Sequence, residues 1–191
     1  MMEKLRQTPS QTIGPFFAYS LTSEQYGYNF DSIVNGSLTD DTAEGKKIFI
    51  KGNIFDGDGN AIHDAMIELW QADANGNYQN QFSTNNFKGF GRLGTGTTSD
   101  KSFTFKTIKP GSIANHAPHI NVIIFMRGSL HALHTRIYFD DEQNEEDTLY
   151  NSVDAEKRKT LIAIRNEEGG KVIYHFDIYM QGENETVFFE I

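Results

Sequence analysis

The chain has 191 residues, no cysteine, and a formal net charge of −9 from 17 basic and 26 acidic side chains. This length fits one domain with a buried core, and the absence of any basic block excludes a protein that binds nucleic acid or an anionic membrane. No apolar run approaches the roughly 20 residues of a membrane-spanning helix, and a chain without cysteine has neither disulfides nor thiolate chemistry, so we expect a cytoplasmic protein.

The first segment of the chain shows no regular period. Residues 7–46 combine Pro, Gly, Ser, Thr and Asn with aromatic residues such as Phe16, Phe17 and Tyr19. This composition predicts an irregular N-terminal arm over residues 1–46 that packs on a partner subunit, followed by a folded domain over residues 47–191.

Alternation of apolar and polar residues predicts strands from residue 47 onward. In residues 47–55, Ile48, Ile50 and Ile54 fall on one face, as in a half-buried strand. The other predicted strands are residues 65–70, 103–105, 119–126, 135–139, 172–180 and 187–191. Residues 119–126 are almost continuously apolar and β-branched, which predicts a central strand buried on both faces.

Residues 79–101 are predicted to be a long polar loop. Within them, Gly89 to Gly94 (GFGRLG) matches the dinucleotide-binding fingerprint. That fingerprint has to follow a buried strand and open a helix, and neither flank fits, so we interpret it as part of the loop.

One short helix is expected late in the chain. Helix-forming residues 154–159 follow Ser152, a suitable N-cap. About seven short strands with turn signals and hardly any helix predict an all-β fold of the β-sandwich type.

Several motifs resemble the intradiol ring-cleavage dioxygenases, which are non-haem ferric enzymes built on an immunoglobulin- or prealbumin-like β-sandwich. The motifs of the wider family are residues 68–73 (ELWQAD), 75–78 (NGNY) and 107–111 (TIKPG). Residues 8–15 (TPSQTIGP) and 181–189 (QGENETVFF) are more specific, and they resemble the iron-free alpha subunit of a two-subunit member. The resemblance spans nearly the whole chain and is weakest over residues 18–46 and 79–101.

The family holds ferric iron with two tyrosines and two histidines, a donor set that suits this hard cation. The resemblance places these four positions on Tyr78, Ile113, His119 and Asn121. Isoleucine has no lone pair and a neutral amide is a weak substitute for imidazole, so we expect a vestigial metal site without iron in this chain. An arginine of the family falls near His116.

The resemblance also implies that an iron-bearing beta subunit is the partner, and that the alpha chain completes a pocket for a catechol and O₂ in a higher-order alpha–beta oligomer. The expected substrate contacts are Thr12, Gly14, Pro15 and Arg127. The Arg127 fork suits the ring carboxylate of such a substrate. Without the resemblance, residues 14–15 would be interpreted as a bend in the arm, and Arg127 would be interpreted as part of an ion pair at the end of a strand.

Two other functions stay open at the level of sequence. The first is a self-sufficient ferric dioxygenase that uses Tyr78, His119 and His116 with a distorted ligand set. The second is a β-sandwich binding or structural module without enzymatic activity.

Overall fold

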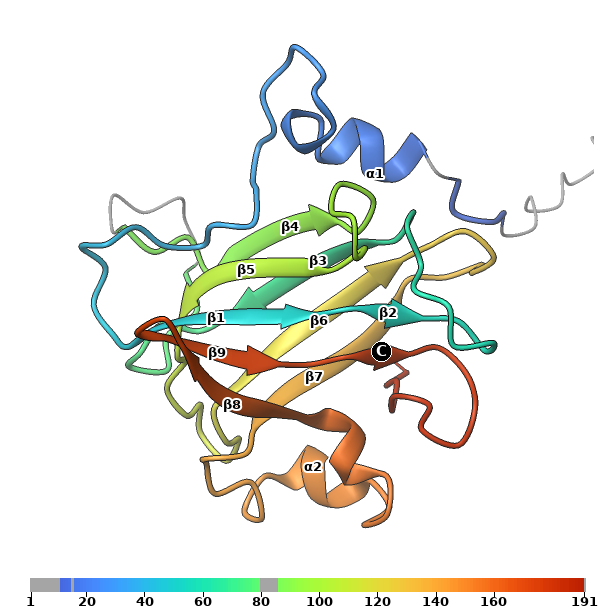
Figure 1. The fold of residues 1–191 in the computed structure, drawn as a ribbon. Coiled ribbons are helices and arrows are strands. Elements are labelled where there is room, and N and C mark those ends of the chain that lie inside the picture. Colours follow the sequence, from blue (N-terminus) through green and yellow to red (C-terminus); the bar gives the residue numbers. More distant parts are fainter. Residues whose placement is uncertain (1–10, 15, 80–85, 191) are drawn as a thin grey trace, which may run out of the picture.

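The computed structural model describes residues 11–14, 16–79 and 86–190, and within them the protein is mostly β-structure (Figure 1). The strands are β1 (Lys47–Gly52), β2 (Ile54–Phe55), β3 (Met66–Gln71), β4 (Phe90–Gly94), β5 (Phe103–Ile108), β6 (His119–Phe125), β7 (Leu133–Phe139), β8 (Ile162–Glu168), β9 (Lys171–His175) and β10 (Ile178–Tyr179). The helical segments are α1 (Phe16–Leu21), α2 (Thr148–Ser152) and the 3-10 turns η1 (Glu24–Tyr26) and η2 (Arg158–Leu161). No helix of the described residues is long and apolar enough to cross a membrane.

Eight strands are hydrogen-bonded into one continuous sheet in the order β4-β3-β6-β7-β8-β9-β1-β5. The two halves of this sheet meet at a short parallel junction, where β7 and β8 pair through Tyr138↔Ile162 and Phe139↔Ala163. The outer strands β4 and β5 contact each other. The sheet therefore curls back on itself until it is nearly closed.

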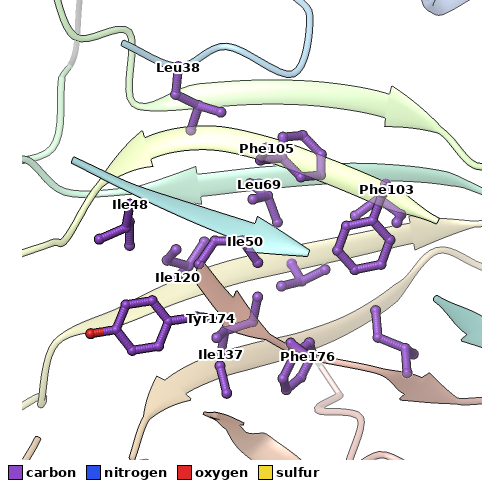
Figure 2. Close-up of a cluster of buried hydrophobic side chains, with 14 of the residues drawn as sticks. Leu38, Ile48, Ile50, Leu69, Phe103, Phe105, Ile120, Ile137, Tyr174 and Phe176 are labelled. Atoms are coloured by element: carbon purple, nitrogen blue, oxygen red, sulfur yellow. The ribbon is translucent and has the colours of Figure 1, made fainter. Parts of the chain in front are cut away.

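The core fills the inside of this curled sheet (Figure 2). Ile48, Ile50 and Ile54 are fully buried, as their alternation predicted. Tyr174, Phe176 and Ile178 share the interior, although the strand predicted over residues 172–180 is interrupted, because β9 ends at His175 and the chain resumes as β10. Residues from both halves of the sheet contribute to one cluster of buried side chains, so the halves stabilise each other.

Strand β6 is buried on one face, not on both as predicted. Ile120, Val122 and Ile124 point into the core, while Asn121 and Phe125 on the opposite face are partly exposed. Because side chains alternate along a strand, the second face of β6 lies on the outer surface of the sheet. That outer face carries His119 and Asn121, two of the positions singled out from the sequence.

The glycine-rich segment inside the predicted loop is a strand. Residues 90–94 form β4, which pairs with β3 over five residues. A Cβ atom at Gly91 would collide with Leu38, and one at Gly94 would collide with Tyr26. These glycines therefore let the N-terminal arm approach the sheet closely, which explains a glycine pattern unrelated to nucleotide binding.

Three further expectations were wrong. The helix is not at residues 154–159 but at α2, where Asp147 and not Ser152 is the N-cap. In residues 187–190 the described backbone forms a single bridge between His134 and Phe189 instead of a strand. The arm is not wholly irregular, because α1 and η1 lie within it and cover the edge of the sheet near β4 (Figure 1).

Candidate functional site

A polar cluster lies on the outer face of the sheet near the start of β6. The antiparallel registers place Asn121 between Trp70 of β3 and Arg136 of β7. The Asn121 Nδ2 donates a hydrogen bond of 2.7 Å to the Tyr78 hydroxyl, and the Asn121 Oδ1 accepts one of 3.1 Å from the Arg136 Nε. The amide therefore links a phenol on one side to a guanidinium on the other.

His119 lies two residues before Asn121 on the same face and is 1% exposed. Its Nδ1 lies 2.7 Å from the carbonyl oxygen of Ala117, which can only accept, so Nδ1 carries the proton. The Nε2 atom then bears a lone pair, is buried, and contacts no hydrogen-bond partner among the described residues. Burial of the imidazole lowers the pKa of His119 to about 4, so the ring is neutral at pH 7.

A second histidine and a buried carboxylate extend the cluster toward α2. The His116 Nδ1 lies 3.2 Å from the Asp147 Oδ2 and 3.4 Å from the Arg136 Nη1. A guanidinium only donates and a carboxylate only accepts, so this nitrogen serves one partner or the other according to its protonation. Burial alone would raise the pKa of Asp147, but hydrogen bonds from the Tyr150 backbone and from His116 outweigh it and lower that pKa.

Ile113 stands at the base of a tight turn next to this cluster. Its backbone N–H and carbonyl pair with the carbonyl and N–H of His116, at 3.0 and 2.8 Å. Ala114 within the turn has a φ of 49°, in the left-handed region. The turn positions the chain, but the Ile113 side chain brings no atom that could bind a metal.

The donors present do not fit ferric iron. Of the four family positions, Tyr78 and His119 keep donor atoms, and only the His119 Nε2 is free of other partners. The Asn121 amide is engaged by Tyr78 and Arg136, and Ile113 offers nothing. One free imidazole and one phenol do not replace two tyrosinates and two histidines, because affinity for the metal depends on the number and type of its ligands.

The predicted substrate contacts form a separate group at the opposite end of β6. The Thr12 hydroxyl accepts a hydrogen bond of 2.9 Å from the Gly128 N–H, and the Ile13 N–H donates to the Ser129 carbonyl. Thr12 and the segment after β6 are thus brought together. Arg127 is 2.9 Å from the Asp64 carboxylate and its side chain is 59% exposed, which is the strand-end ion pair that its position suggested. Pro15 lies outside the described residues.

The two predicted groups do not share one site in this chain. From His119 to Phe125, β6 advances six residues, about 20 Å at the rise of an extended strand. His119 and Asn121 lie at the start of this strand, with Tyr78 bonded to Asn121, and Arg127 and Thr12 lie beyond its end. A substrate of the size of a single aromatic ring cannot contact both groups.

The sequence did not reveal two central residues of the cluster. Arg136 was within a predicted strand, but its place opposite Asn121 depends on the β6–β7 register. Asp147 was interpreted as part of a solvated acidic run, yet its side chain is fully buried. The spacing of Asp147 from the following helix was the available signal, because aspartate is a favoured N-cap.

Comparisons with known proteins identify the family of the chain. The family model described as Dioxygenase matches residues 21–182. The chain is 46% identical over 197 residues to the protocatechuate 3,4-dioxygenase alpha chain of Burkholderia cepacia, covering 100% of both chains. It is 29% identical over 160 residues to the beta chain of the same organism's enzyme, covering 74% of this chain and 67% of the other. Among solved structures, the dioxygenase domain of a carbohydrate-binding fusion protein from Streptomyces sp. SirexAA-E matches with a TM-score of 0.63 at 25% identity, covering 84% of this chain and 95% of that one.

Proposed function

Because the chain belongs to the intradiol dioxygenase family and resembles an alpha chain of that family over its whole length, we propose that it is the iron-free alpha subunit of a protocatechuate 3,4-dioxygenase. One observation carries this proposal. The chain keeps the family's fold, while two of the four metal-ligand positions hold Ile113 and Asn121 and the Asn121 amide is engaged by other side chains.

In this proposal the working site lies at the contact with an iron-bearing beta subunit. Both atoms of O₂ are added to protocatechuate and the ring opens between its hydroxylated carbons, giving 3-carboxy-cis,cis-muconate for the β-ketoadipate pathway. The ferric iron of the beta subunit supplies the activation of the bound catecholate. The alpha chain contributes a wall of the pocket and contacts to the substrate.

Each predicted contact has a physical part in this pocket. The planar fork of Arg127 orients the ring carboxylate by two parallel hydrogen bonds. Arg127 is exposed enough to change partner from Asp64 to a substrate. Among the described residues beyond its chain neighbours, no atom lies within 4 Å of a Cβ built on Gly14, so the close approach that a glycine permits is left for a neighbour in another chain.

The same proposal includes the fold type, the assembly and the cellular location of the chain. The fold is a β-sandwich of the family's type, with β4-β3-β6-β7 facing β5-β1-β9-β8 across the common core, which is supported by the two-pair junction between the halves. Alpha and beta chains assemble into a higher-order oligomer, which is supported by relatives of both kinds. The complete absence of cysteine supports a cytoplasmic location.

The test is the iron content and the activity of the full chain, purified alone and after co-expression with a beta-type partner. We expect little iron and no ring cleavage from the chain alone, and ring cleavage from the complex. Stoichiometric iron and activity in the isolated chain would instead establish the self-sufficient dioxygenase. A stable chain that never pairs with a beta-type partner would favour the non-enzymatic module.

A further inference from the structure

The vestigial metal site contains a cation of its own. Arg136 lies on β7 directly opposite Asn121, on the outer face that also carries His119. Its guanidinium lies within hydrogen-bond distance of Asn121 Oδ1 at 3.1 Å, His116 Nδ1 at 3.4 Å and the Tyr138 hydroxyl at 3.4 Å. An amide oxygen, an imidazole nitrogen and a phenol oxygen are lone-pair donors of the kinds that otherwise surround a metal.

The charge of this guanidinium is not neutralised by a direct ion pair. Among the described residues no carboxylate lies within 4 Å of the Arg136 guanidinium, whereas Arg92 and Arg165 each contact an acidic side chain. The nearest charge compensation comes through His116, which contacts the buried Asp147. Arg136 is therefore held mainly by neutral donor atoms, as a bound cation would be.

We propose that the Arg136 guanidinium takes the place of the metal as the resident cation of this site, and that it excludes iron from it. This inference rests on the proposed function, in which iron belongs to the partner. An arginine keeps its positive charge at all physiological pH values and is more weakly hydrated than an ammonium, so it tolerates this partly buried place. A ferric ion that approached the free Nε2 of His119 would meet a fixed like charge.

Two different features of this chain would keep iron out of the site. One is the loss of ligands at positions 113 and 121, and the other is the cation at position 136. If lost ligands were the whole cause, restoring them would restore the metal site. If Arg136 acts as a resident cation, restored ligands are insufficient until that charge is removed.

The experiment compares three full-chain variants that all carry Ile113→Tyr and Asn121→His. The first keeps Arg136, the second adds Arg136→Gln, and the third adds Arg136→Lys, which retains the charge. Iron is counted per chain after purification, and the visible absorption of ferric tyrosinate is recorded. We expect the Gln variant to rise to about one iron per chain, as the restored four-ligand set allows, and the Arg and Lys variants to stay near the wild-type level.

Iron in the variant that keeps Arg136 would overturn the inference, and so would the absence of iron from a folded Gln variant. The unaltered chain is the control that keeps the two proposals apart, because iron in that chain would refute the proposed function instead. Circular dichroism and thermal unfolding establish which variants fold.

A second measurement does not depend on iron. Arg136→Ala leaves the three donor atoms around a space of the size of a guanidinium. We expect the melting temperature of this variant to rise on addition of guanidinium, at concentrations far below the denaturing range and against sodium chloride of equal ionic strength. Arg165→Ala, a variant of a partly buried arginine on β8 that contacts Glu167, is the matched control and should not respond. Equal responses of the two variants would overturn the inference.

Discussion

His119 is a buried histidine whose protonation the fold opposes. Metal-binding histidines commonly donate one ring N–H to a carbonyl and present the other nitrogen to the metal, and His119 has this arrangement through Ala117. Its Nε2 is buried and has no hydrogen-bond partner among the described residues. The residue therefore makes stability depend on pH in a way that can be measured.

The expected dependence follows from the lowered pKa of about 4. Between pH 6.5 and pH 4 the unfolded chain protonates this histidine and the folded chain does not, so unfolding takes up a proton and becomes easier as the pH falls. The stabilisation is complete above about pH 6.5, and about 2 kcal/mol of it is lost between pH 7 and pH 5. Urea unfolding at the two pH values checks this.

His119→Gln should remove this contribution to the pH dependence, whereas His131→Gln, at an exposed histidine, should keep it. An unchanged pH dependence in the His119 variant would show that the folded protein admits a proton there.

Arg127 tests the proposed pocket most directly. In the complex, Arg127→Ala removes a charge-assisted contact to the substrate carboxylate, and we expect the KM for protocatechuate to rise about 10- to 100-fold, the range of a hydrogen bond to a charged group. The control is Arg165→Ala, which removes an equally charged side chain far along the sheet on β8. Unchanged steady-state kinetics in the Arg127 variant would refute its role.

Two glycines separate contacts within the chain from contacts with a partner. Gly91→Ala would push a methyl group against Leu38, so we expect the chain to lose about 1–3 kcal/mol of stability. Gly14→Ala meets nothing among the described residues beyond its chain neighbours, so the stability of the chain should stay unchanged while the activity of the complex falls. Thermal unfolding of the chain and assays of the complex distinguish the two, and full activity with Gly14→Ala would remove Gly14 from the pocket.

At the scale of elements, the short helix α2 depends on one aspartate. The Asp147 Oδ1 accepts hydrogen bonds from the backbone of Leu149 and Tyr150, at 2.8 and 3.0 Å, while its Oδ2 accepts one of 3.0 Å from the Ala117 backbone. The same side chain thus caps the helix and fixes the loop that leads into β6. The helix and the start of the vestigial site are consequently one structural unit.

We expect Asp147→Ala to cost about 2–4 kcal/mol, because it removes an N-cap and leaves a buried backbone donor without a partner. Asp147→Asn, which keeps an acceptor oxygen, should cost less. Asp154→Ala, at an exposed position, serves as the control. Chemical denaturation would contradict this account if the two alanine variants were equally stable.

Sequence pattern predicted those elements whose side chains alternate. The buried isoleucines at positions 48, 50 and 54 marked β1 and β2, because a half-buried strand imposes a period of two. Strand β4 was missed because Gly91 and Gly94 have no side chains to form a pattern. The segment is a strand because it pairs with β3 over five residues, and such pairing depends on residues that are distant in the sequence.

Only some residues of the candidate site were singled out from the sequence. Resemblance placed Tyr78, His119 and Asn121 together, and the hydrogen bond between Tyr78 and Asn121 agrees with that placement. Arg136 and Asp147 escaped because their roles depend on the β6–β7 register and on the path of the chain into α2. The local sequence determines neither the strand register nor the path of the chain.

At the scale of the whole molecule, the two ends of β6 have different neighbours. Exposed aromatic and aliphatic side chains gather in the arm and after β6, at Phe17, Tyr28, Phe30, Ile33 and Leu130. Large contiguous apolar patches commonly mark interaction sites, and we propose that a partner covers this end of the molecule. At the start of β6, His119 is buried and the Asp147 side chain holds the Ala117 backbone, while Trp70 and Tyr78 beside Asn121 are exposed.

Hydrogen exchange in the free chain and in the complex distinguishes these ends. We expect amides in residues 16–33 and 126–131 to exchange more slowly in the complex, because a partner covers them. Residues 111–121 should exchange equally in both states. Protection confined to residues 111–121 would place the partner on the vestigial site and would contradict the arrangement proposed for the two chains.

The pairing of β1 has a consequence for how the protein is made. β1 pairs on one side with β5 and on the other with β9, whose residues follow it by more than a hundred positions. During synthesis, one edge of β1 stays unpaired until residues 171–175 have emerged from the ribosome, and contacts between such distant segments form slowly. A nascent chain that stalls before residue 171 therefore cannot complete the curled sheet.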